Sequence, residues 1–111
     1  MEIKDAVMLA KEALEDKKAF DVKVLNITGL SPIGDYFLIA TGNNTNQIQA
    51  MSDAADEVLQ KNGICARQIE GYQNANWILM DYGDFMIHIF NPESREFYNL
   101  ERIWRDAKVE E

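Results

Sequence analysis

The strongest constraint on the fold is a pair of apolar stretches with a turn signal between them. Residues 76–81 and 84–90 are rich in branched and aromatic side chains, and Tyr82-Gly83 separates them. This pattern predicts a β-hairpin, because glycine readily adopts the backbone conformation that a tight two-residue loop requires. With Tyr82-Gly83 as the loop, Asp81 pairs with Asp84, and the register of the whole hairpin follows.

This register divides the hairpin into two different faces. One face is entirely apolar and is expected beneath helices; it contains Ile78, Met80, Phe85, Ile87 and Ile89. The other face places Trp77 opposite His88, Leu79 opposite Met86, and Asp81 opposite Asp84. Aromatic residues and Met are enriched at binding surfaces, so the mixed face is a candidate interaction surface. The alternative is a second core layer under further helices, but facing carboxylates are costly to bury.

The rest of the chain predicts the element order α-β-β-α-β-β-β-α. The expected elements are a helix over about 2–19, strands over about 22–27 and 36–41, a helix from an Asn44 or Thr45 N-cap to Gly63, a strand over 64–70, the hairpin, and a C-terminal helix containing Leu100, Ile103, Trp104 and Ala107. A strand–helix–strand crossover followed by a meander predicts one α/β domain over residues 1–111, with a mixed five-stranded sheet and helices packed against it.

Charge and composition restrict the class of partner. Nineteen acidic and eleven basic residues give a net charge of −8, and the basic residues are scattered. Direct binding to nucleic acid is therefore disfavoured, since it normally requires clustered Lys and Arg. An acidic surface suits a basic protein partner, although solubility alone explains the charge equally well. One cysteine and the absence of a long apolar run indicate a cytoplasmic protein outside the membrane.

Catalytic chemistry finds little support in the residue pattern. Asp81 and Asp84 are three positions apart across a loop, whereas nucleotidyltransferases hold metal-binding carboxylates two apart on one strand. His88 is the only histidine, so a cluster of histidines for zinc is excluded. Cys65 and His88 could form a nucleophile pair, but Cys65 is expected to be a small core residue of an alternating strand. We therefore expect no catalytic residue, metal or cofactor.

Three ordered motifs resemble the ribosomal silencing factor, or Iojap, family. The first is Asp35-Tyr36-Phe37, Thr41-Gly42, Gln47 and Ala50; the second is Glu70-Gly71, Trp77-Ile78-Leu79, Asp81-Tyr82-Gly83-Asp84 and His88-Ile89-Phe90; the third is Arg95, Phe97-Tyr98, Leu100-Glu101, Ile103-Trp104 and Asp106-Ala107. The matches run from about residue 3 to 107. Asn46 departs from the family, which often has Arg there, so a role for a basic side chain at this position is in doubt.

The resemblance implies a mixed α/β fold related to nucleotidyltransferases but without their activity. It also implies binding to ribosomal protein L-fourteen of the large ribosomal subunit, which blocks joining of the small subunit and represses translation in poor nutrition. The predicted partner-binding residues are Trp77, Leu79, Asp81, Tyr82, Asp84, Met86, His88 and Tyr98. The alternatives are a divergent nucleotidyltransferase and a homodimeric scaffold that pairs through the mixed face.

Overall fold

The computed structural model describes residues 2–30, 32, 34–103 and 108–110, which form an α/β domain. Its elements are α1 (Ile3–Asp16), β1 (Phe20–Asn26), β2 (Tyr36–Thr41), α2 (Thr45–Lys61), β3 (Gln68–Glu70), β4 (Trp77–Asp81), β5 (Phe85–Phe90), α3 (Pro92–Tyr98), α4 (Leu100–Ile103) and β6 (Lys108–Glu110). The predicted mixed sheet is confirmed. Helix α3 and strand β6 are additions to the predicted order, and the relation to nucleotidyltransferases stays a prediction.

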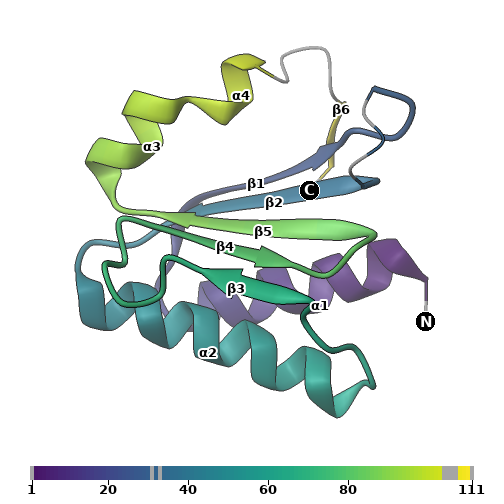
Figure 1. Cartoon of the computed structure of the whole chain (residues 1–111), viewed down its shortest axis with the longest axis horizontal. Coiled ribbons are helices and arrows are strands. Elements are labelled where there is room, and N and C mark those ends of the chain that lie inside the picture. Colours follow the sequence, from purple (N-terminus) through teal and green to yellow (C-terminus); the bar gives the residue numbers. More distant parts are fainter. Residues whose placement is uncertain (1, 31, 33, 104–107, 111) are drawn as a thin grey trace.

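The strands form one sheet in the order β3-β4-β5-β2-β1-β6. Strands β2 and β5 are parallel, and the other neighbouring pairs are antiparallel. Helices α1 and α2 cover one face of this sheet, while α3 and α4 lie on the opposite side (Figure 1). The two faces of β4 and β5 therefore have different surroundings.

The face toward α1 and α2 forms the main core. All five residues predicted on the apolar face of the hairpin are buried in it, so that prediction is confirmed. Helix α2 contributes Ile48, Met51, Ala55 and Leu59 to the same core. The helix begins at the Asn44 cap, whose side-chain oxygen accepts a hydrogen bond from the Gln47 backbone nitrogen at 2.8 Å. This capping satisfies a donor that the first turn of a helix otherwise leaves unpaired.

The predicted register of the hairpin is wrong by two residues. Gly83 and Asp84 are the loop residues, with the Tyr82 nitrogen donating to the Phe85 carbonyl oxygen at 3.1 Å. Gly83 has a φ of 86°, which favours glycine at the first position of a tight hairpin loop. Asp81 consequently pairs with Met86, Leu79 with His88, and Trp77 with Phe90. Since strand side chains alternate with a period of two, a shift of two residues leaves both faces unchanged.

One further prediction is wrong, and another falls partly on residues that the structure does not describe. Strand β3 begins only at Gln68, and Cys65 is exposed before it, so its predicted place in the core is wrong. In the C-terminal helix α4, Leu100 packs against the apolar cluster that contains Phe37, Ile39 and Phe90. Trp104 and Ala107 lie outside the described residues. Over the described part of the chain, no helix has the length and apolar character needed to cross a membrane.

Candidate functional site: the distal face of the hairpin

The candidate site lies on the face of β4 and β5 turned away from α1 and α2. We call it the distal face; it is formed by Trp77, Leu79, Asp81, Met86 and His88, which alternate with the core residues along the two strands. Part of this face packs against a smaller apolar cluster beneath α4. Trp77, Leu79, Asp81 and Met86 are each partly accessible to solvent. The distal face is therefore covered only in part.

Trp77 is held in a fixed orientation at the start of β4. Its indole Nε1 donates a hydrogen bond to Nδ1 of His88 at 3.1 Å. Its ring lies 4.5 Å from the ring of Tyr98 and 5.1 Å from that of Phe90, measured between centroids. Aromatic pairs at such separations contribute beyond the area that they bury. Trp77 thus presents its remaining surface to solvent from a rigid position.

His88 supports Trp77 from beneath. The side chain is 4% exposed, and burial lowers its pKa from the ordinary value of 6.5 to about 4. The imidazole is therefore neutral near pH 7, and because Nδ1 accepts the bond from Trp77, the proton resides on Nε2. Nε2 is buried and has no hydrogen-bond partner among the described residues. His88 is suited to position Trp77 rather than to exchange protons with a substrate.

A shallow recess of about 350 Å³ opens beside Trp77. It is lined by Glu70, Gly71, Trp77 and Leu79, so its walls combine apolar surface with one carboxylate. Gly71 has a φ of 80°, and a Cβ atom at this position would collide with the carbonyl oxygen of Trp77. Only glycine therefore allows the chain to pass this close to β4.

The acidic residues near the loop have separate environments. Asp81 is partly buried, and its Oδ1 accepts a hydrogen bond from the Gly83 backbone nitrogen at 2.8 Å. Asp84 is exposed in the loop. Among the described residues, no group of three or more His, Cys, Asp or Glu could hold a metal ion. The described part of this loop can meet a basic partner, but it does not assemble a metal centre.

Tyr82 is the predicted site residue that the structure separates from the others. It packs in the core on the side of α2, and its hydroxyl donates to the Asp56 carboxylate at 2.8 Å. Burial, followed by this hydrogen bond, raises the pKa of Tyr82. The side chain locks the hairpin to α2, whereas Trp77, Leu79, Met86, His88 and Tyr98 gather around the distal face.

Helix α3 was missed by the sequence analysis, and it carries Tyr98 to Trp77. The side-chain oxygen of Asn91 accepts from the Ser94 nitrogen at 2.8 Å, and Pro92 occupies the first turn. An Asn cap followed by proline is a known helix-start signal, so residues 91–92 could have indicated this helix. The helix also carries Phe97, whose side chain is 81% exposed.

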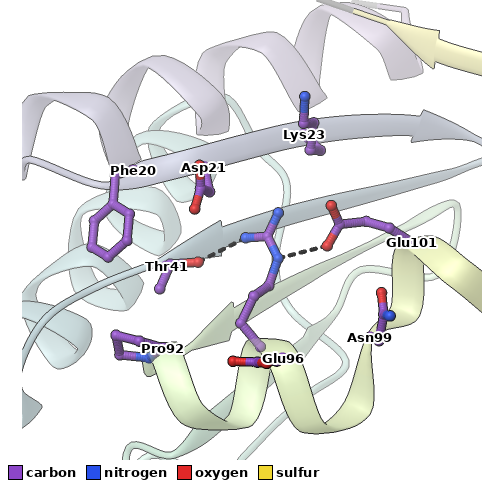
Figure 2. Close-up of a pocket in the computed structure, with 9 residues that line it drawn as sticks. Phe20, Asp21, Lys23, Thr41, Pro92, Glu96, Asn99 and Glu101 are labelled. Atoms are coloured by element: carbon purple, nitrogen blue, oxygen red, sulfur yellow. Dashed lines mark hydrogen bonds and ion pairs between the residues drawn. The ribbon is translucent and has the colours of Figure 1, made fainter.

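A polar cleft of about 430 Å³ lies between α3–α4 and the strands β1 and β2 (Figure 2). The Arg95 guanidinium crosses it, with Nε donating to the Glu101 carboxylate at 2.7 Å and Nη1 donating to the Thr41 hydroxyl at 2.7 Å. The Arg95 side chain is only 10% exposed, whereas that of Glu101 is 36% exposed, so water reaches this ion pair only from the side of the glutamate. The arginine ties both short helices to the end of β2.

Comparisons with known proteins place this chain close to one family. The family model described as "Ribosomal silencing factor during starvation" matches residues 1–111. The ribosomal silencing factor RsfS of Halalkalibacterium halodurans is 42% identical over 111 residues, covering 100% of this chain and 95% of its own. A mouse protein named "Mitochondrial assembly of ribosomal large subunit protein 1" is 32% identical over 95 residues, covering 82% of this chain and 41% of its own.

A solved structure supports the same assignment. The crystal structure of a protein from Chromobacterium violaceum superposes with a TM-score of 0.91 at 33% sequence identity, covering 94% of this chain and 87% of that one. The matched family model spans the Trp77 strand, the hairpin loop and the α3 motif that form the candidate site. The chain therefore belongs to the family of ribosomal silencing factors, the Iojap family.

Proposed function

We propose that this protein represses translation in poor nutrition by binding the large ribosomal subunit through its distal face. The proposed contact is ribosomal protein L-fourteen, and the bound factor blocks joining of the small subunit. The direct contacts come from Trp77, Leu79, Met86 and Tyr98, with Asp81 and Asp84 at the edge. His88 holds Trp77 in place. The action is cytoplasmic and requires no chemical step.

The observation that carries this proposal is the immobilised, partly exposed indole of Trp77. Its hydrogen bond to His88 and its packing against Tyr98 restrict its rotation before any partner arrives. A side chain ordered in advance loses less conformational entropy on binding. Tryptophan is also strongly enriched among the few residues that carry most of an interface's binding energy. Trp77 therefore has both the residue type and the setting of an interface anchor.

The charge around the distal face favours a basic partner. Glu70 lines the recess beside Trp77, and Asp81 and Asp84 lie at the hairpin loop. The whole chain carries a net charge of −8. Opposite potentials accelerate encounter and select among partners. A positively charged ribosomal protein meets these requirements, and so the proposed partner is protein rather than RNA.

The name of the mouse relative supports the choice of the large subunit, because it refers to assembly of that subunit. The size of the domain supports the mechanism. Its principal extents are 34 × 33 × 23 Å, which is wide enough to exclude another macromolecule from the surface on which it sits. Steric exclusion lasts only while the factor is bound, so the repression is reversible by mass action.

Co-sedimentation with separated ribosomal subunits tests the proposal. The wild-type protein is expected to pellet with large subunits and to remain in the supernatant with small subunits. Trp77→Ala is expected to raise the dissociation constant for the large subunit at least tenfold, because truncated anchors commonly cost more than about 2 kcal/mol. Leu30→Ser is the control, since Leu30 is an exposed apolar residue, 48% accessible, in the β1–β2 loop.

Light scattering on the free protein distinguishes the ribosome from a second copy as the occupant of this face. A dimer of the free protein that Trp77→Ala dissociates, combined with no binding to large subunits, would contradict the proposal. A folded Trp77→Ala variant that binds large subunits as tightly as the wild type would place the anchor elsewhere. Circular dichroism of each variant is needed, since Trp77 also contacts Phe90 of the core.

A further inference from the structure

We propose that Phe97 of α3 is a second anchor for the same partner, inserting into an apolar socket whose rim is basic. This inference rests on the proposed function and extends its contact surface along α3, beyond Tyr98. The hairpin pattern did not identify Phe97 as a site residue, because Phe97 lies in α3, seven residues beyond the end of β5.

The exposure of Phe97 is exceptional among the described large apolar side chains. It is 81% accessible, whereas Leu30, Ile69, Tyr98 and Val109 lie between 38% and 49%. A single exposed apolar residue is ordinary on a protein surface, but an exposed aromatic ring next to other aromatic rings forms a patch. The folded domain obtains almost no burial from this ring, so packing within the domain does not account for it.

Phe97 is continuous with the distal face. Its ring lies edge-on to the ring of Tyr98, with centroids 5.1 Å apart and an interplanar angle of 90°. Tyr98 in turn lies 4.5 Å from Trp77. The three rings therefore form a connected row from the helix to the sheet. A partner seated on Trp77 and Tyr98 meets Phe97 next.

The helix that carries Phe97 is held in place from two directions. A seven-residue helix is not stable in isolation, because nucleation is costly and few hydrogen bonds repay it. Here Asn91 caps the first turn and its side-chain nitrogen donates to the Asn76 side chain at 2.9 Å. Arg95 fastens the second turn to Thr41 and Glu101. Phe97 is thereby presented at a defined place, which lowers the entropic cost of inserting it into a partner.

The charges beside Phe97 specify the rim of the socket. Glu93 is exposed one turn before Phe97 on the same helix. Glu96 is exposed at the cleft, and the basic residue of the helix, Arg95, is turned into that cleft and engaged with Glu101. The outer surface of α3 is therefore acidic around an apolar centre. Lys or Arg side chains surrounding an apolar depression complement that arrangement.

Affinity measurements on purified large ribosomal subunits test this inference with labelled full-length protein. Phe97→Ser is expected to raise the dissociation constant at least tenfold, while the thermal midpoint changes little because the side chain is exposed. Phe97→Leu is expected to keep most of the affinity, since an apolar socket accepts another apolar side chain. Leu30→Ser, which removes a different exposed apolar side chain, is expected to bind as the wild type does. Glu93→Lys is expected to weaken binding several-fold at low salt.

The outcomes separate this inference from the proposed function. If wild-type protein does not bind large subunits, the proposed function fails. If Trp77→Ala abolishes binding but Phe97→Ser binds within twofold of the wild type, the proposed function stands and the Phe97 anchor is overturned. A stable dimer of the free protein that Phe97→Ser dissociates would also overturn it, because the socket would then belong to a second copy.

Discussion

At the scale of single residues, the buried His88 makes folding depend on pH. Its pKa is about 4 in the folded protein against an ordinary 6.5, so the unfolded chain takes up the proton first as pH falls. The stabilisation is complete above pH 6.5 and is lost progressively as pH falls toward 4. Between pH 7 and pH 5 the free energy of unfolding is expected to fall by about 2 kcal/mol through this group.

Urea unfolding of wild type and His88→Asn at pH 7 and pH 5 measures this loss. Asparagine has a side-chain oxygen that can accept the Trp77 bond, but it does not titrate in this range. The variant is expected to lack the His88 contribution to the pH dependence. If the free energy of unfolding changes equally between pH 7 and pH 5 in the two proteins, the assignment of a buried neutral imidazole is contradicted.

The exposed carboxylate of Asp84 tests the electrostatic part of the proposed contact. Asp84→Lys is expected to weaken binding to large subunits several-fold at low ionic strength without loss of stability, because the residue is exposed in the loop. Wild-type affinity is expected to fall as salt rises, since salt screens exposed charges, and Asp81→Lys should weaken binding as well. Fluorescence titration at several salt concentrations gives both results. If charge reversal and added salt both leave the affinity unchanged, the partner surface is not basic.

At the scale of elements, the glycines before β4 provide a matched pair of substitutions. Gly63 and Gly71 have φ values of 78° and 80°, so alanine at either position meets the same left-handed strain of about 1–2 kcal/mol. A Cβ at Gly63 meets open space, whereas a Cβ at Gly71 meets the Trp77 carbonyl oxygen. Gly71→Ala is therefore expected to be the more destabilising variant and to weaken large-subunit binding by displacing Trp77.

Thermal melts and co-sedimentation of the two variants decide this point. Gly63→Ala is expected to bind as well as the wild type once it is folded. Equal stability and equal binding of both variants would show that the segment before β4 adjusts freely, and that Gly71 does not position Trp77.

The hairpin and α3 show which features of the fold can be predicted from the sequence. Side-chain alternation in residues 76–90 identified the two faces correctly, because a face depends only on the parity of the register. The register itself was missed, since the choice between Tyr82-Gly83 and Gly83-Asp84 as loop depends on where the glycine needs its positive φ. Helix α3 is too short to show an apolar period, and only its Asn91-Pro92 start marks it.

The candidate site was only partly predictable for a similar reason. Trp77, Leu79 and Met86 followed from the hairpin pattern alone. The burial of Tyr82 against Asp56 depends on a contact between residues far apart in the chain, which local patterns do not contain. The exposed position of Phe97 depends on the Arg95 anchor to β2, which is also a long-range contact.

At the scale of the whole molecule, the domain is a plate with one helical side and one partly open side (Figure 1). Helices α1 and α2 stabilise the sheet through the main core, and the opposite side, which α3 and α4 cover only in part, is the proposed partner surface. Its largest extent of 34 Å makes the bound domain an obstacle rather than a small ligand. Under the proposed function, repression depends on occupancy of the large subunit, and its strength depends on the concentrations of the factor and the small subunit.

The order of addition in a translation assay tests whether the protein acts by steric exclusion. Protein added to large subunits before small subunits is expected to block formation of the complete ribosome and to inhibit translation strongly. The same amount added to preassembled, elongating ribosomes is expected to have little effect, because its site is already covered. Trp77→Ala is expected to inhibit weakly in either order. Equal inhibition by the wild type in both orders would contradict steric exclusion.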